Sequence, residues 1–373
     1  MKLRNINFIT LFLGFILSYY YYIHFILGQL NMYSFGKSVT WVLVFSTLAI
    51  PLTFLILKRS GNNLRILTLE TFINRFKLNK SFMIFKVLIT IYFFISLIFT
   101  LFYTISFDTI YFYNDFNIYI IGFALIIPII IFSKKINKTT FLVVPFLVIL
   151  LILYFIFYNV NPNPLYLYTL EWTKLNNYEE LIKLIIIILP LYLEPFIFFY
   201  LCDLSNKEIK IKHMIFGIIF ISIIPAYFYL RCGNEFGVLL TYIEYPFFEC
   251  WRNIKLNEYI ENADYLNTII WVLLAVYRIM FSCMFINKIW NKKTRLIPII
   301  ISILSLMIAL IFELDLFVYK EYQMTLLFIS SSSLLISFFI TIFYLFKAGG
   351  KNVKEKNSWF IKKQFWSKLF WNY

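Results

Sequence analysis

The sequence predicts an all-helical protein that crosses a membrane many times. Of its 373 residues, 61% are hydrophobic and only 14% are charged, whereas a soluble domain is about half apolar and a quarter charged. The apolar residues form runs of about 20, the length that a helix needs to cross a bilayer. These runs show no strand-like alternation, and lipid offers no partner for an unpaired backbone group, so helices are expected. This composition argues against a soluble enzyme, a disordered chain and a disulfide scaffold.

Ten apolar runs are long enough to be membrane spans. We predict them at 6–28, 38–57, 82–105, 116–133, 139–158, 181–202, 212–230, 264–290, 295–312 and 323–347. The first run is too long for a signal peptide and is followed by no small-residue cleavage site. The chain is therefore expected to have a ten-helix transmembrane domain over 1–347 and a basic, aromatic tail over 348–373. Such a tail suits an anionic lipid surface, and a tail solvated by water is the alternative.

The positions of the basic residues predict the orientation. With the N-terminus inside, the inner segments carry 25 of the 34 Lys and Arg residues and the outer segments carry seven. The other two, Lys86 and Arg278, lie within spans. This asymmetry is a strong positive-inside signal, which places both termini in the cytoplasm and the long segment 231–263 outside.

Metal, cofactor and nucleic-acid chemistry find little support in the sequence. The four cysteines are too few and too scattered for a disulfide framework or a metal site, and there are only two histidines. The net charge of +15 comes from short loops between apolar runs, which the positive-inside rule explains without a nucleic acid. We expect no cofactor, no metal and no nucleic-acid partner.

Two charges deep within spans mark the candidate functional site. A charge in a bilayer costs on the order of 2.5–3.5 kcal/mol, so it points to function by default. Glu194 lies near the middle of the sixth span, between Pro190 and Pro195. Prolines disfavour a continuous helix, and a helix broken at mid-membrane leaves backbone groups that can bind a small polar ligand. A proline kink, with Glu194 paired to a neighbouring helix, is the alternative.

Arg278 follows Asp264 by 14 residues, which puts it about 21 Å along the eighth span. That depth prevents easy access to the outer surface, so Arg278 should face the interior. Glu194 is its most economical partner. A purely structural ion pair, and a guanidinium standing where a coupling cation would bind, both remain open. Lys86, by contrast, lies only a turn inside its span and is expected to extend to the surface.

The first span offers a weaker set of candidates. Gly14 permits either a helix break or close packing, but no proline accompanies it. Ser18 is followed by four consecutive tyrosines at 19–22. These point all round a helix, so some of them must face the interior, and an aromatic packing face is the alternative.

The segment 241–290 resembles the B subunits of bacterial spore germinant receptors, a branch of the amino acid/polyamine/organocation permease superfamily. The residues on the family pattern are Tyr245, Pro246, Glu249, Arg252, Glu261, Asp264, Trp271 and Arg278. Segments 68–70 and 193–194 are also similar to the family, and ten spans fit the whole chain. Asn262 stands where the family has Arg, and Gly14 stands alone where the family has a glycine-rich break.

The resemblance implies a fold of two inverted five-helix repeats, with spans one and six broken and facing each other. It implies a non-catalytic sensor of a small germinant, often an amino acid, in the spore inner membrane, acting with an A-type subunit and a lipoprotein C-type subunit. The ligand would contact backbone in spans one and six, beside tyrosines and the two charges. The expected binding residues are Gly14, Ser18, Tyr19, Tyr92, Pro190, Tyr192, Glu194, Pro195, Tyr277 and Arg278.

Three other functions remain open from the sequence. One is a working amino acid permease that uses alternating access. Another is a polytopic enzyme of polysaccharide or lipid-linked glycan synthesis, acting from outer-loop residues such as Arg231 and Arg252. A scaffold subunit whose ligand site has decayed is the third.

Overall fold

The structure is a computed structural model, and it describes the helical centre of the chain. The described residues are 10, 12–22, 80–111, 117–132, 143–158, 182, 186, 193–194, 196–197, 232, 235–236, 243, 245, 248–250, 264–290, 296–319 and 321–343. These residues are almost entirely helical and include no strand. The labelled helices are α4 (Lys80–Tyr111), α5 (Ile118–Phe132), α7 (Val144–Tyr158), α11 (Asp264–Trp290) and α12 (Leu296–Leu314).

Several helices are long and apolar enough to cross a membrane. Within the described part of the chain these are Phe82–Asp108, Thr268–Trp290, Leu296–Leu314 and Leu316–Phe343, with a shorter apolar helix at Ile118–Ile131. The last of the four long helices is called the C-terminal helix below. The protein is therefore a helical, multi-pass membrane protein, as its composition predicts.

Capping residues fix where two of these helices begin. Asn117 precedes α5, and its Oδ1 accepts a hydrogen bond from Tyr119 N at 2.9 Å. Asp315 separates α12 from the C-terminal helix, and its Oδ1 accepts from Phe317 N at 3.0 Å and from Val318 N at 3.2 Å. Short polar side chains at such positions satisfy amides that a helix start leaves without partners. The single capping residue explains why α12 and the C-terminal helix follow each other so closely.

The distribution of side chains on α12 is that of a helix in lipid. Its large apolar residues point outward, among them Ile300, Leu304, Met307 and Ile311. Its interior face carries small and polar residues such as Ser302, Ser305 and Ala309. A soluble helix has the opposite arrangement. Small residues on the inner face let membrane helices approach closely, since lipid gives apolar side chains no reason to turn inward.

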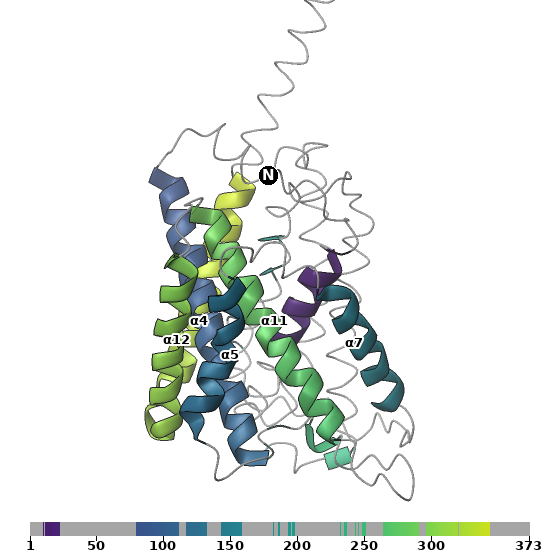
Figure 1. Ribbon diagram of the computed structural model, residues 1–373. Coiled ribbons are helices and arrows are strands. Elements are labelled where there is room, and N and C mark those ends of the chain that lie inside the picture. Colours follow the sequence, from purple (N-terminus) through teal and green to yellow (C-terminus); the bar gives the residue numbers. More distant parts are fainter. Residues whose placement is uncertain are drawn as a thin grey trace, which may run out of the picture.

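α4 and α11 form the centre of the bundle. α4 packs against α12, α11 and α5, and α11 also packs against α7. In Figure 1, α4, α5, α12 and the yellow C-terminal helix gather on one side, while α11 crosses the middle toward the purple helix of residues 12–22 and α7. Contacts between Phe15 and Phe281 and between Tyr21 and Trp271 join the first helix to α11. This arrangement brings the midpoints of α4 and α11 face to face.

Six predicted spans overlap described helices, although α4 ends later than predicted and the C-terminal helix begins earlier. The spans 82–105, 116–133, 139–158, 264–290, 295–312 and 323–347 lie on α4, α5, α7, α11, α12 and the C-terminal helix. Spans 38–57 and 212–230, and the tail 348–373, lie outside the described residues. Residues 12–22 form a continuous α-helix, so the described part of the first span has no break at Gly14–Tyr19, and close packing is the alternative that remains for Gly14. A single glycine without a proline leaves every backbone amide able to bond within the helix.

Candidate functional site

Arg278 forms a bidentate ion pair with Glu194 at the centre of the bundle. Arg278 Nη1 lies 2.6 Å from Glu194 Oε1, and Nη2 lies 3.2 Å from Oε2. Both side chains are 0% exposed. Two parallel N–H···O bonds use the planar fork of the guanidinium, the strongest geometry for such a pair. The partnership predicted from the depths of the two charges is therefore present.

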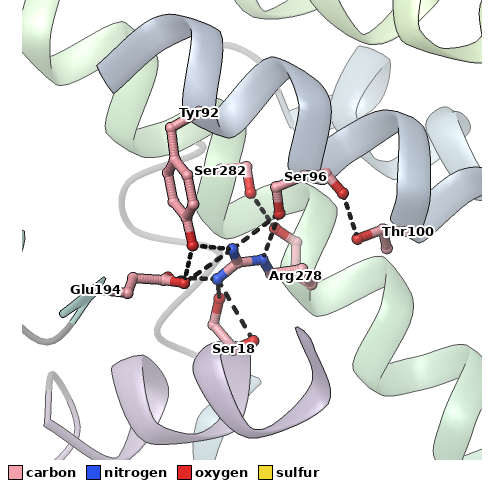
Figure 2. A network of polar contacts seen from close by, with 7 residues as sticks. All are labelled: Ser18, Tyr92, Ser96, Thr100, Glu194, Arg278 and Ser282. Atoms are coloured by element: carbon pink, nitrogen blue, oxygen red, sulfur yellow. Dashed lines mark hydrogen bonds and ion pairs between the residues drawn. The ribbon is translucent and has the colours of Figure 1, made fainter. Parts of the chain in front are cut away.

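Hydroxyl groups complete the hydrogen bonding of this pair, as Figure 2 shows. Ser96 Oγ accepts from Arg278 Nε at 3.1 Å and from Nη2 at 2.8 Å. Ser18 Oγ accepts from Nη1 at 3.1 Å. The Tyr92 hydroxyl donates to Glu194 Oε2 and lies 3.5 Å from Arg278 Nη2. We call these five residues the central network. It leaves neither charge without partners, which is the condition for keeping an ion pair away from water.

Four separate elements supply the central network. Ser18 comes from the helix of residues 12–22, Tyr92 and Ser96 from α4, and Arg278 from α11. Glu194 comes from the predicted sixth span, of which the structure describes six residues. There Ile182 and Ile186 are α-helical, whereas Leu193 is in a turn and Glu194, Phe196 and Ile197 have 3₁₀ geometry. Phe196 N accordingly donates to Leu193 O, three residues back, at 3.0 Å. Among the described residues of this span, the helix type therefore differs between Ile186 and Glu194, and the flanking prolines predict an interruption in this region.

Aromatic rings enclose the guanidinium. The Arg278 Cζ atom lies 4.4 Å from the centre of the Tyr22 ring and 5.6 Å from that of Phe93. Tyr22 also meets Tyr92 edge to face at 6.1 Å. Ring faces attract a cation, and these rings also exclude water from the pair. Arg278 is thus held by its carboxylate, by hydroxyls and by π faces at once.

Two hydroxyls close to the central network have no hydrogen-bond partner among the described residues. These are Tyr22 Oη and Ser330 Oγ, both on buried side chains. The hydroxyl of Tyr22 has Ser330 and Ser96 as neighbours, but no contact with either meets hydrogen-bond geometry. Buried polar groups are normally satisfied, so each such group needs an explanation. Their position beside Arg278 makes them available to a polar ligand.

The structure brings together only some of the residues predicted to bind ligand. Ser18, Tyr92, Glu194 and Arg278 meet in the central network. Tyr19 stacks on Phe15 at 6.0 Å and bonds to neither charge. Tyr277 and Gly14 are buried, and neither bonds to Arg278 or Glu194. Pro190, Tyr192 and Pro195 lie outside the described residues, as do Arg231 and Arg252 of the enzyme alternative. Tyr277 directly precedes Arg278, and adjacent side chains leave an α-helix about 100° apart. The two side chains therefore point in different directions.

Ser96 is the member of the network that the sequence analysis missed. It accepts two hydrogen bonds from Arg278 and is 0% exposed. The sequence does contain a pattern that indicates Ser96. Hydroxyl-bearing residues recur at every fourth position along α4, at Tyr92, Ser96, Thr100 and Thr104. Residues at this spacing share one helix face. In an otherwise apolar span, that hydroxyl stripe indicates which face meets a buried charge.

A second polar cluster lies further along α4. Gln323 Nε2 donates to the Tyr103 hydroxyl at 2.9 Å, and that hydroxyl also bonds to Tyr319. Ser106 Oγ donates to the Glu313 carboxylate near the end of α12. Lys86, predicted to extend to the surface, is only 9% exposed and lies over the Phe82 ring at 4.8 Å. Tyr103 and Ser106 of α4 are therefore engaged by residues of α12 and the C-terminal helix.

No protein-family model, no curated protein and no solved structure matches the chain. Within the described residues, no group of three or more His, Cys, Asp or Glu side chains could hold a metal ion.

Proposed function

We propose that the protein is a non-catalytic membrane subunit that binds a small zwitterion, most simply an amino acid, at Arg278 and Glu194. The observation that carries the proposal is the buried bidentate pair. An amino acid has one carboxylate and one ammonium group, so it offers a new partner to each member of the pair. Its carboxylate would pair with Arg278 and its ammonium with Glu194. No buried charge is then left alone in the bound state, which is the main energetic obstacle to opening such a pair.

The surroundings of the pair support a ligand of this size and polarity. The Tyr22 hydroxyl, which has no hydrogen-bond partner among the described residues, can donate to or accept from a ligand beside Arg278. Glu194 lies on a short 3₁₀ turn rather than within an α-helix, so fewer backbone bonds oppose its movement. Ligand binding would separate Glu194 from Arg278 and shift the bundle between two arrangements. Such a shift, passed to other subunits, is how a sensor without catalytic activity reports its ligand.

The sequence pattern suggests the biological setting. Its likeness to spore germinant receptor B subunits leads us to propose ten spans in two inverted five-helix repeats, with the sixth span interrupted at Glu194. In that setting the protein acts in the spore inner membrane, with both termini in the cytoplasm. An A-type subunit and a lipoprotein C-type subunit are its partners, and a small germinant is its ligand.

Germination of spores that carry variants of the central network tests this function. Glu194→Gln and Arg278→Met should abolish the response to amino acids while the protein still reaches the membrane, measured by immunoblot of spore membranes. Lys86→Met is the matched control, because Lys86 is also a buried base on a membrane helix but lies outside the network. Normal amino acid sensitivity in both network variants would remove the pair from the mechanism.

Uptake measurements separate sensing from transport. The purified protein is placed in liposomes and supplied with labelled amino acids. A sensor should bind label in proportion to protein and reach a plateau at once. Sustained accumulation, lost in Arg278→Met, would instead assign the same site to a permease with alternating access.

A further inference from the structure

Two cysteines from the predicted outer segment 231–263 meet in the structure. Cys232 and Cys250 are 18 positions apart, yet the two Sγ atoms lie 3.0 Å from each other. Their side chains are 0% and 2% exposed. The separation exceeds the S–S bond length by about 1 Å, so a small side-chain movement brings the sulfurs to bonding distance. The geometry points to a disulfide between Cys232 and Cys250.

The surrounding contacts give the bond a structural role. Cys250 follows a helical turn in which Tyr245 O accepts from Phe248 N at 3.0 Å and from Glu249 N at 3.1 Å. Tyr245 and Phe248 pack on Phe107, near the end of α4, with ring centres at 5.5 and 4.6 Å. A bond to Cys232 therefore ties a second part of the outer segment to this docked turn. Linking residues so far apart removes freedom from the unfolded segment and stabilises the fold.

The third described cysteine shows that this proximity is specific. Cys283 lies on α11, where its Sγ donates to Pro298 O at 3.9 Å, and it forms no disulfide with another described cysteine. It therefore has no partner for a disulfide within the described part of the chain. The spacing of the cysteines in the sequence did not predict that Cys232 and Cys250 lie next to each other.

The predicted orientation places the pair where disulfides persist. The segment 231–263 faces outward by the positive-inside count, away from the reducing cytoplasm. The oxidant is the disulfide of an exofacial thiol–disulfide oxidoreductase. One cysteine thiolate attacks that disulfide, forms a mixed disulfide and releases one oxidant thiolate. The second cysteine thiolate then attacks the sulfur of the first, which releases the other oxidant thiolate. The chain loses two electrons and two protons, and the oxidant is reduced to a dithiol.

Burial of both sulfurs determines the stage of folding at which the thiols can be oxidised. Because the folded pair is covered, oxidation takes place as the segment folds outside the membrane, before packing closes over the thiols. The bond is therefore a permanent part of the folded protein and does not depend on the ligand site. Its test is independent of the proposed function for the same reason.

Thiol counting by mass spectrometry tests the disulfide. The full-length chain is taken from the membranes of cells that produced it, denatured, and alkylated with N-ethylmaleimide before and after reduction. Since the chain has four cysteines, we expect two adducts before reduction and four after it. Proteolysis without reduction should yield one linked pair of peptides that contain Cys232 and Cys250.

Serine variants supply matched controls. Cys232→Ser should show three adducts with or without reduction, because its former partner is left as a thiol. Cys283→Ser should show one adduct before reduction and three after it, because the disulfide remains. Four adducts on most wild-type chains before reduction would overturn the proposal, as would a linkage that involves Cys202 or Cys283.

Discussion

At the scale of the residue, Arg278 is suited to its position by the shape of its side chain. A guanidinium presents five N–H donors in a planar fork. Here the fork reaches the carboxylate of Glu194 on one side and the hydroxyls of Ser18 and Ser96 on others. A lysine would offer three donors at one point and could not span these acceptors. The chemistry of the site thus depends on the identity of this residue as well as on its charge.

Removing one charge should be far worse for stability than removing both. Arg278→Met leaves the Glu194 carboxylate buried without its cation, which should lower the free energy of unfolding by about 3–5 kcal/mol. The double change Arg278→Met with Glu194→Leu should recover at least half of that loss, because no charge remains to be compensated. Denaturation of the purified protein in detergent measures both. A double variant no more stable than Arg278→Met would show that the ion pair is not the source of the effect.

The two neighbouring tyrosines of the first helix should respond differently to loss of the hydroxyl. Tyr22→Phe keeps the ring over Arg278 but removes an unpaired buried hydroxyl, so stability should be unchanged or higher. Tyr21→Phe is the control, because its hydroxyl bonds to Thr104 Oγ1 at 3.0 Å. Its loss should cost about 1 kcal/mol.

The same pair of variants also tests the ligand site. Under the proposed function, Tyr22→Phe should weaken the amino acid response despite its preserved stability, whereas Tyr21→Phe should respond normally. Thermal unfolding and spore germination are the two measurements. Equal behaviour of the two variants in both assays would contradict this role for the Tyr22 hydroxyl.

At the scale of the element, α4 organises the polar interior. Its hydroxyl stripe lies at positions 92, 96, 100 and 104. Ser96, near the middle of α4, contacts Arg278, and Thr104, further along the helix, contacts Tyr21. Thr100 and Thr104 also donate to carbonyl oxygens one turn earlier, at 2.7 and 2.6 Å. In lipid such local bonds satisfy hydroxyls without water. The stripe is therefore compatible with a membrane helix while leaving Tyr92 and Ser96 free to serve the ion pair.

The contact between α5 and α12 should be sensitive to the size of one residue. A Cβ atom at Gly122 would lie 2.7 Å from Leu306 Cδ1 and 3.3 Å from Ile105 Cδ1. Alanine should be tolerated, because the end of the Leu306 side chain can move. Gly122→Ile should separate the helices and lower stability by about 1–3 kcal/mol, as overpacking typically does.

Ala124 provides the control on the same helix. It is exposed on α5, where the bilayer surrounds the protein, so Ala124→Ile adds the same bulk without an opposing helix. Its unfolding in detergent should match that of the wild type. A comparable loss of stability in Ala124→Ile would mean that the side-chain change, and not the helix contact, is responsible.

At the scale of the whole molecule, the sequence predicts the positions of the helices better than it predicts the tertiary contacts between them. The span 264–290 coincides with α11 because a long apolar run in lipid has one structural solution. α4 extends past its predicted end at 105 to Tyr111, since Ser106 bonds to Glu313 and Phe107 packs on Phe248. Those partners come from distant parts of the chain, and no local pattern identifies them.

The same distinction applies to the candidate site. Glu194 and Arg278 were predictable because a charge in a bilayer is costly and must find a partner. Ser96 was not selected because serines are frequent in membrane helices, and only the position of Arg278 gives this one a role. The proximity of Cys232 and Cys250 is a tertiary contact, which hydrophobic periodicity does not determine. The continuous helix at 12–22 shows that glycine alone does not interrupt a span.

The orientation of the entire bundle is the prediction on which the proposed setting and the disulfide both depend. Twenty-five of the 34 basic residues fall on one predicted side, and short basic loops resist translocation across the membrane. Reporter fusions measure this directly. A fluorescent protein fused after Tyr373 should fold and emit, because that end is expected in the cytoplasm, whereas alkaline phosphatase there should be inactive. Alkaline phosphatase inserted within 253–262 should be active, since that loop is expected outside. The reverse pattern would place Cys232 and Cys250 in a reducing compartment and would require an odd number of spans or an inverted bundle.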